Sequence, residues 1–76
     1  MSNINTSGQW NEFYVKKGDY LVELSENHFM NKEYKKTLEL LSQAYAMYEK
    51  ASAHELAVKT KEKFTHIKET FFKKKE

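Results

Sequence analysis

Apolar residues recur every three or four positions along most of the chain, which is the period of an α-helix with one buried face. The first stripe predicts a helix over roughly residues 9–30. Its members are Trp10, Phe13, Tyr14, Lys17 (through its methylene groups), Tyr20, Leu21, Leu24, His28 and Phe29. Met1 to Gly8 shows no such pattern. Residues 1–8 are therefore predicted to form a flexible tail, and residues 9–76 a single helical domain.

Gly18, followed by Asp19, lies inside this first stripe. Glycine in a helix interior costs about 1 kcal/mol relative to alanine, and aspartate is a favourable N-cap, so a break at this point is one possibility. The 3–4 spacing of apolar residues runs through both residues, which favours a helix that is continuous or merely kinked.

The next segment, over about residues 32–50, is apolar on half of its circumference, and Asn31 is the predicted N-cap. One stripe consists of Tyr34, Leu38, Leu41, Tyr45 and Tyr48, and the stripe beside it of Thr37, Leu40, Ala44, Met47 and Ala51. A helix with two apolar stripes usually packs against two neighbours. We therefore expect this helix in the middle of an array of helices.

Ser52-Ala53-His54-Glu55 matches a capping box, in which the Ser hydroxyl and the Glu carboxylate each accept an amide proton of the first helical turn. It predicts a third helix over about residues 53–73. The apolar stripe of this helix is narrow and consists of Ala53, Leu56, Thr60, Phe64, Ile67 and Phe71. Because the connections are so short, consecutive helices should be antiparallel, and the predicted fold is an all-α, up-down-up bundle of three helices.

The chain has 76 residues with no Cys and no Pro, which leaves room for one small domain and excludes disulfides and thiolate metal sites. Its formal net charge is +2, and all the basic residues are Lys, which disfavours sequence-specific reading of DNA by paired Arg contacts. No apolar run approaches the length of a membrane span, and Met1 to Gln9 lacks the features of a signal peptide. We therefore expect a cytoplasmic protein.

The sequence contains no recognisable catalytic or metal-binding motif. His28, His54 and His66 lie in different parts of the chain without the spacing of metal ligands, and they are expected at the edge of the core (His28) or exposed (His54). We expect no enzyme activity, no bound metal and no cofactor.

Aromatic residues interleaved with Lys are also found in proteins that stack on single-stranded nucleic acids. Most aromatic residues here lie on stripes that should be buried, so a structural role in the core is preferred. Contact of Ile67, Phe71 and Phe72, followed by Lys73 to Lys75, with an anionic membrane surface is disfavoured because the apolar face is modest and Glu76 reduces the charge.

Three residues of the third helix, Val58, Thr65 and Phe72, lie well away from its main stripe. Together with Leu40 and Met47 they could line an apolar groove between the second and third helices, with Lys61 and Lys68 at its rim attracting acidic residues. The predicted function is that of a non-enzymatic module that binds a short helical or extended segment of another protein. The alternative is a small, free-standing homodimeric regulator or inhibitor, of bacterial or phage type, that uses the same surplus apolar surface.

The segment from Asn31 to Lys50 resembles the second helix of a tetratricopeptide hairpin, because Tyr34, Leu38 and Ala44 match its pattern. A similar pattern occurs in the microtubule-interacting-and-trafficking (MIT) domain, and Leu21, Val22 and Ser25 stand where that family has Leu, a β-branched residue and a small residue. The resemblance covers roughly residues 14–72. It implies a three-helix module that receives a peptide in a groove between helices, typically from filament subunits of the ESCRT-III type.

Overall fold

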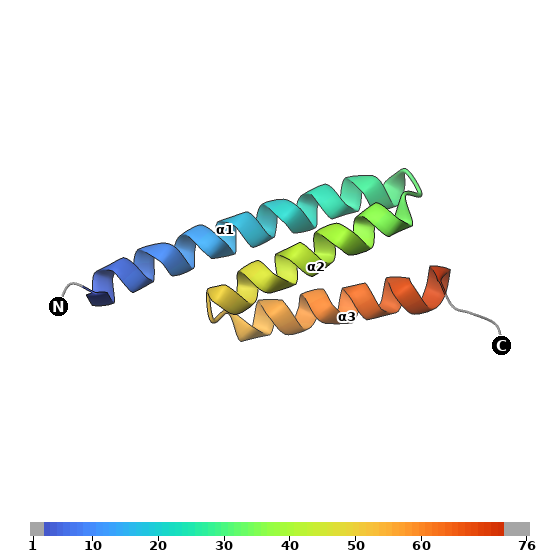
Figure 1. Cartoon of the computed structure of the whole chain (residues 1–76). Helices are drawn as coiled ribbons and strands as arrows, with labels where there is room; N and C mark the ends of the chain where they lie inside the picture. Colours follow the sequence, from blue (N-terminus) through green and yellow to red (C-terminus); the bar gives the residue numbers. More distant parts are fainter. Residues whose placement is uncertain (1–2, 73–76) are drawn as a thin grey trace.

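The computed structural model describes residues 3–72, with side chains from residue 10 onward. This part of the chain forms three α-helices and no strand: α1 (Asn3–Met30), α2 (Tyr34–Lys50) and α3 (His54–Phe71). The prediction of an all-α protein with three helices is therefore confirmed. The helices lie side by side, and the chain reverses direction at each connection (Figure 1).

The first helix is longer than its apolar pattern predicts, because it begins at Asn3 rather than at residue 9. The helix therefore includes residues 3–8, which the sequence assigned to a tail, while Met1 and Ser2 lie outside the described residues. No Pro interrupts this stretch, and a helix that is already nucleated gains one hydrogen bond for each residue that it adds. The third helix ends at Phe71, and the predicted end at residue 73 also lies outside the described part.

α2 occupies the middle of the fold, as its two apolar stripes predict, and it packs against both α1 and α3. The backbones of α1 and α3 make little contact with each other, and the molecule measures 24 × 14 Å across its two shorter axes. The arrangement is therefore closer to a layer of helices than to a closed bundle. The buried apolar residues are Leu21, Leu40, Leu41, Ala44, Tyr48, Ala51, Ala57 and Ile67.

The two connections between helices have the same backbone geometry. Lys32 (φ 63°) and Ser52 (φ 59°) both adopt the left-handed conformation directly after a helix. The amide of Lys32 donates to the carbonyl of Phe29, and the amide of Glu33 donates to that of His28. Around Ser52 the equivalent bonds run from Ser52 to Glu49 and from Ala53 to Tyr48. This pair of bonds defines a Schellman motif, in which a left-handed residue ends the helix.

This geometry corrects both predicted N-caps. α2 is preceded by Glu33 and α3 by Ala53, and neither residue makes a side-chain capping hydrogen bond. Asn31 and Ser52 instead belong to the turns that end the preceding helices. The capping-box pattern at Ser52 thus marks the right boundary for a different physical reason.

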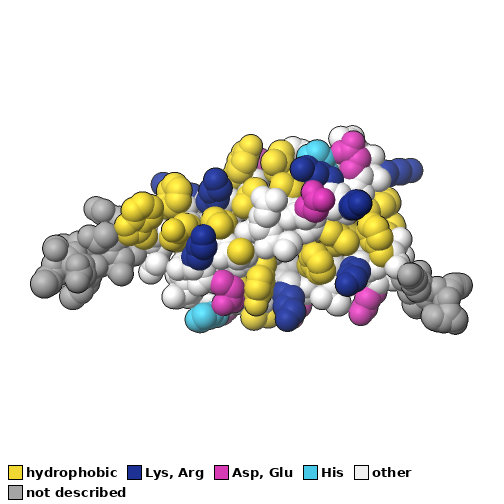
Figure 2. Space-filling model, in the orientation of Figure 1, with side chains coloured by type: hydrophobic (Ala, Val, Ile, Leu, Met, Phe, Trp, Pro, Cys, Tyr) yellow, Lys and Arg dark blue, Asp and Glu magenta, His cyan; other side chains and the backbone are white. Residues whose placement is uncertain are grey.

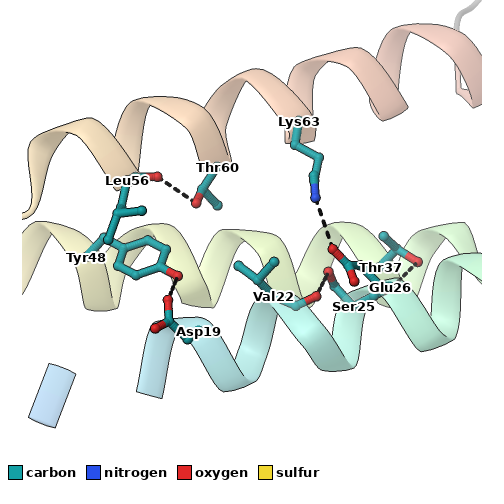
Figure 3. A network of polar contacts seen from close by, with 9 residues as sticks. All are labelled: Asp19, Val22, Ser25, Glu26, Thr37, Tyr48, Leu56, Thr60 and Lys63. Atoms are coloured by element: carbon teal, nitrogen blue, oxygen red, sulfur yellow. Dashed lines mark hydrogen bonds and ion pairs between the residues drawn. The ribbon is translucent and has the colours of Figure 1, made fainter. Parts of the chain in front are cut away.

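Gly18 lies within a continuous α1, at a point where a side chain of α2 comes very close to the helix backbone. A Cβ atom at Gly18 would come within 2.6 Å of Cε1 of Tyr48. The same ring donates its hydroxyl proton to Oδ1 of Asp19 at 2.5 Å (Figure 3). Burial, the hydrogen bond and the negative charge of Asp19 all raise the pKa of the Tyr48 hydroxyl far above its ordinary value. Gly18 and Asp19 are therefore a docking site for Tyr48 rather than a helix break.

Several aromatic residues predicted to be buried on α1 are exposed. Nζ of Lys50, the last residue of α2, lies 5.4 Å from the centre of the Tyr14 ring. The N-terminal part of α1 extends beyond this end of α2 (Figure 1). Trp10 and Phe13 are 52% and 50% exposed, and Tyr20 is 59% exposed. The apolar spacing of α1 was interpreted as a single core face, but it is wider than the surface that α2 covers.

Candidate functional site

Two adjoining hollows lie between α2 and α3. The larger, of about 530 Å³, is lined by Tyr45 of α2 and by Val58, Lys61, Glu62, Thr65, His66 and Glu69 of α3. The smaller, of about 160 Å³, is lined by Leu41, Ser42, Tyr45, Lys61 and Phe64. Because Tyr45 and Lys61 line both hollows, these residues together form one continuous surface, which we call the α2–α3 groove.

The structure brings together three of the residues that the sequence assigns to this groove: Val58, Lys61 and Thr65. Val58 is 54% exposed, although its side chain is entirely apolar, and Lys61 and Thr65 are also exposed. They lie on one flank of α3, about 70–130° around the helix from the midpoint between Ala57 and Thr60, which face α2 and are buried. This part of the predicted site is accessible to a partner.

Leu40 and Met47 do not belong to the groove. At about 100° per residue, Leu40 is about 140° and Met47 about 200° around α2 from Tyr45, which lines the groove. Leu40 is 4% exposed and forms part of the core, and Met47 packs against that core. The structure therefore does not place these two residues in the groove, because they occupy the stripe of α2 that is used for internal packing.

Lys68 and Phe72 are also separate from the groove. Lys68 is exposed and lines neither of the two hollows. Phe72 lines a different hollow, of about 790 Å³, at the turn between α1 and α2. The other residues of that hollow are His28, Lys32, Glu33, Tyr34, Lys35, Lys36 and Glu39. Within it, Nδ1 of His28 lies 2.6 Å from Oε1 of Glu33, and Lys36 forms an ion pair with Glu39.

Sequence reasoning did not assign seven groove residues that the structure supplies: Leu41, Ser42, Tyr45, Glu62, Phe64, His66 and Glu69. Leu41, Tyr45 and Phe64 were assigned to core stripes. Tyr45 and Phe64 are only half-buried, so each contributes to the packing of the two helices and to the surface of the groove. Tyr45 and Phe64 could have been identified from the sequence by their positions near the edge of an apolar stripe.

A second pair of hollows lies where side chains of α1 and α3 meet over α2. Their volumes are about 240 and 140 Å³, and both include Lys63. Nζ of Lys63 donates to Oε2 of Glu26 at 3.3 Å, which links α3 to α1 between the two hollows (Figure 3). This ion pair divides the surface into small compartments. The α2–α3 groove is larger, and no ion pair recorded for the described residues crosses it.

The chemistry of the groove is that of a binding surface with charges of both signs. Lys61 supplies a positive charge, and Glu62 and Glu69 supply negative charges. Among the described residues, no group of three or more His, Asp or Glu side chains could hold a metal ion. The same part of the chain has no buried side-chain nitrogen or oxygen without a hydrogen-bond partner.

The fold and the groove define an all-α protein of three helices with an exposed, partly aromatic surface between the last two. No protein-family model, curated protein or solved structure matches the chain significantly. None of the helices in the described part is long and apolar enough to cross a membrane.

Proposed function

We propose that this protein is a non-enzymatic interaction module that binds a short amphipathic helix of another protein in the α2–α3 groove. The observation that carries this proposal is the continuity of the groove around Tyr45, Val58 and Lys61. Tyr45 and Val58 offer apolar surface, and Lys61 lies beside it in both hollows. A helical ligand fits such a surface because residues three and four positions apart form one apolar face that can cover the groove.

The ligand chemistry follows from the residues of the groove. Leu, Met or Val side chains of the ligand would cover Tyr45 and Val58, while acidic residues would approach Lys61. Glu62 and Glu69 favour a Lys or Arg elsewhere on the same ligand. The resemblance of residues 14–72 to MIT and tetratricopeptide modules, which receive peptides between helices, supports this function.

The proposal is tested with amphipathic helical peptides selected for binding to the full chain, followed by affinity measurements on two double variants. Val58→Ser with Lys61→Glu should weaken binding at least tenfold, which corresponds to about 1.4 kcal/mol. The matched control is Leu56→Ser with Lys59→Glu, which likewise replaces one apolar side chain by Ser and one Lys by Glu, two residues earlier in each case. Because two residues span about 200° of helix, these changes lie on another side of α3.

The control variant should bind the selected peptides with unchanged affinity. Equal losses in both double variants, or none in the groove variant, would exclude the α2–α3 groove as the binding site. Circular dichroism of each variant verifies that helicity is retained.

A second candidate function is a small homodimeric regulator or inhibitor that acts by binding a target protein. The exposure of Trp10, Phe13 and Tyr20 on α1 favours it, since these residues give the chain an apolar surface remote from the α2–α3 groove.

A further inference from the structure

The exposed aromatic residues of α1 form a regular seam. Trp10, Phe13, Lys17, Tyr20, Leu24 and Asn27 follow one another at intervals of three, four, three, four and three residues. This is the spacing of the contact positions in a coiled coil. Trp10, Phe13 and Tyr20 are each at least half exposed, and Leu24 is partly exposed. We call these six residues the α1 seam.

The α1 seam lies on the side of α1 that faces away from α3, and its Leu24 also packs against the edge of the core. Val22 and Glu26 mark the side of α1 that faces α3, because Val22 lines a hollow with Leu56 and Glu26 accepts a hydrogen bond from Lys63. The seam is centred about 170° around the helix from Val22. The rings of Trp10 and Phe13 contact each other edge to face, with centroids 5.7 Å apart. Hydrophobic side chains gather on the part of α1 that projects beyond the other helices (Figure 2).

We propose that the α1 seam binds a second copy of this chain, with the two α1 helices antiparallel. Charge complementarity supports this occupant. When the two-fold axis passes midway between Lys17 and Tyr20, Phe13 of each copy lies opposite Leu24 of the other. The same alignment places Lys16 opposite Glu23, and the symmetry produces this pair twice.

The central contact distinguishes the antiparallel arrangement from the parallel one. In the antiparallel alignment Lys17 lies opposite the Tyr20 ring, where its methylene groups and its charge can both interact with the aromatic face. A parallel alignment would instead place Lys17 opposite Lys17, and like charges at that position are unfavourable. Lys16, Lys17 and Glu23 are exposed, so all are available for these contacts.

The size of the seam is sufficient for a weak dimer. An aromatic side chain carries roughly 200 Å² of surface, so the exposed halves of Trp10, Phe13 and Tyr20 supply about 300 Å² per chain. With Lys16, Lys17, Glu23 and Leu24, two copies bury on the order of 1,000 Å², which is the lower end of specific interfaces. We therefore expect a dissociation constant in the micromolar range. This surface is separate from the α2–α3 groove, so dimerisation does not depend on the proposed peptide binding.

Sedimentation equilibrium of the full chain over about 5–500 μM tests the proposal. A reversible monomer–dimer equilibrium is expected. Lys16→Glu alone and Glu23→Lys alone should each weaken the dimer at least fivefold, because each change creates two like-charge pairs. The double variant Lys16→Glu with Glu23→Lys should restore the original affinity. Lys35→Glu, a charge reversal at an exposed position on α2, is the matched control and should leave the dimer unchanged.

The orientation is tested by cross-linking, for which the absence of native Cys is an advantage. Under mild oxidation, a mixture of Lys16→Cys and Glu23→Cys chains should form the mixed disulfide faster than either variant pairs with itself. A chain that stays monomeric throughout the concentration range would overturn the proposal. So would a dimer whose affinity is insensitive to the charge reversals, or preferential self-pairing of the Cys variants, which indicates a parallel or different interface. The peptide-binding result is independent of each of these outcomes.

Discussion

Gly18 is important for helix packing because its missing side chain leaves room for the Tyr48 ring of α2. The interior of a helix normally favours alanine over glycine by about 1 kcal/mol. Here the Tyr48 ring occupies the position where a side chain at residue 18 would begin, and this ring is 3% exposed. The close approach of α1 and α2 therefore outweighs the local helix preference.

Gly18→Ala is expected to lower the free energy of unfolding by about 1–3 kcal/mol, because the added methyl group overlaps a buried ring. In the background of Tyr48→Leu, which removes the overlapping ring atoms, the same change should be neutral or stabilising. Urea unfolding of the four chains measures this double-mutant cycle. A loss of the same size in both backgrounds would show that the cost arises elsewhere than at Tyr48.

Both connections between helices end the preceding helix with the same backbone geometry. Each uses a left-handed residue that is not glycine, Lys32 in one turn and Ser52 in the other. This conformation costs an L-residue roughly 1–2 kcal/mol. In each turn it allows two amides to satisfy carbonyls at the end of the preceding helix. The hydrogen bonds of the turn, rather than a capping side chain, thus determine where the next helix begins.

Ser52→Gly is therefore expected to stabilise the protein by about 0.5–1 kcal/mol, since glycine adopts the left-handed region without strain. Ser52→Ala should change stability by less than about 0.5 kcal/mol, whereas the loss of a side-chain N-cap typically costs about 1 kcal/mol. Ser42→Gly, at an exposed position inside α2, is the control and should be destabilising. Thermal or urea unfolding distinguishes these outcomes, and a destabilised Ser52→Gly variant would contradict the turn geometry.

In the whole molecule, the central position of α2 separates the two proposed binding surfaces. The α2–α3 groove lies on one side of the central helix, and the α1 seam lies on the side of α1 that faces away from α3. One copy could therefore hold a partner peptide and a second copy without competition between them. A dimer formed through α1 would present two α2–α3 grooves, which would increase the apparent affinity for a partner with two binding segments.

Local stability should differ between the N-terminal part of α1 and the centre of α2. Residues 10–13 of α1 are all exposed, so this segment can open without breaking the core around Leu41 and Ala44. In dilute protein the amides of residues 10–13 should exchange with solvent at least 100-fold faster than those of residues 41–44. Hydrogen exchange followed by NMR measures this difference, and equal protection of both segments would contradict it.

The exchange experiment also reports on self-association. If the α1 seam binds a second copy, protection of residues 10–13 should increase with protein concentration, because dimerisation packs this segment. Protection of the core amides near Leu41 should change little at concentrations where the fold is already stable. This contrast separates dimerisation from a general increase in stability.

The number of helices, their approximate boundaries except the start of α1, and the central position of α2 could all be predicted from the amino-acid sequence. Each of these follows from the spacing of apolar residues, which is a local property of a helix and does not depend on its neighbours. The two stripes that contain Leu41 and Ala44 required two neighbouring helices, and the structure supplies them. Three of the seven residues assigned to the groove, Val58, Lys61 and Thr65, were identified from the same periodicity.

Which apolar residues remain exposed could not be predicted from the sequence, because it depends on how the helices pack. Leu40 and Tyr45 are both on apolar stripes, yet one is in the core and the other lines the groove, because the rotation of α2 between its neighbours selects the side that is covered. Trp10 is exposed because α1 is longer than α2, and Gly18 is required because Tyr48 meets α1 at that level. Rotation, helix length and axial position are set by packing between helices, which the period of a single helix does not contain.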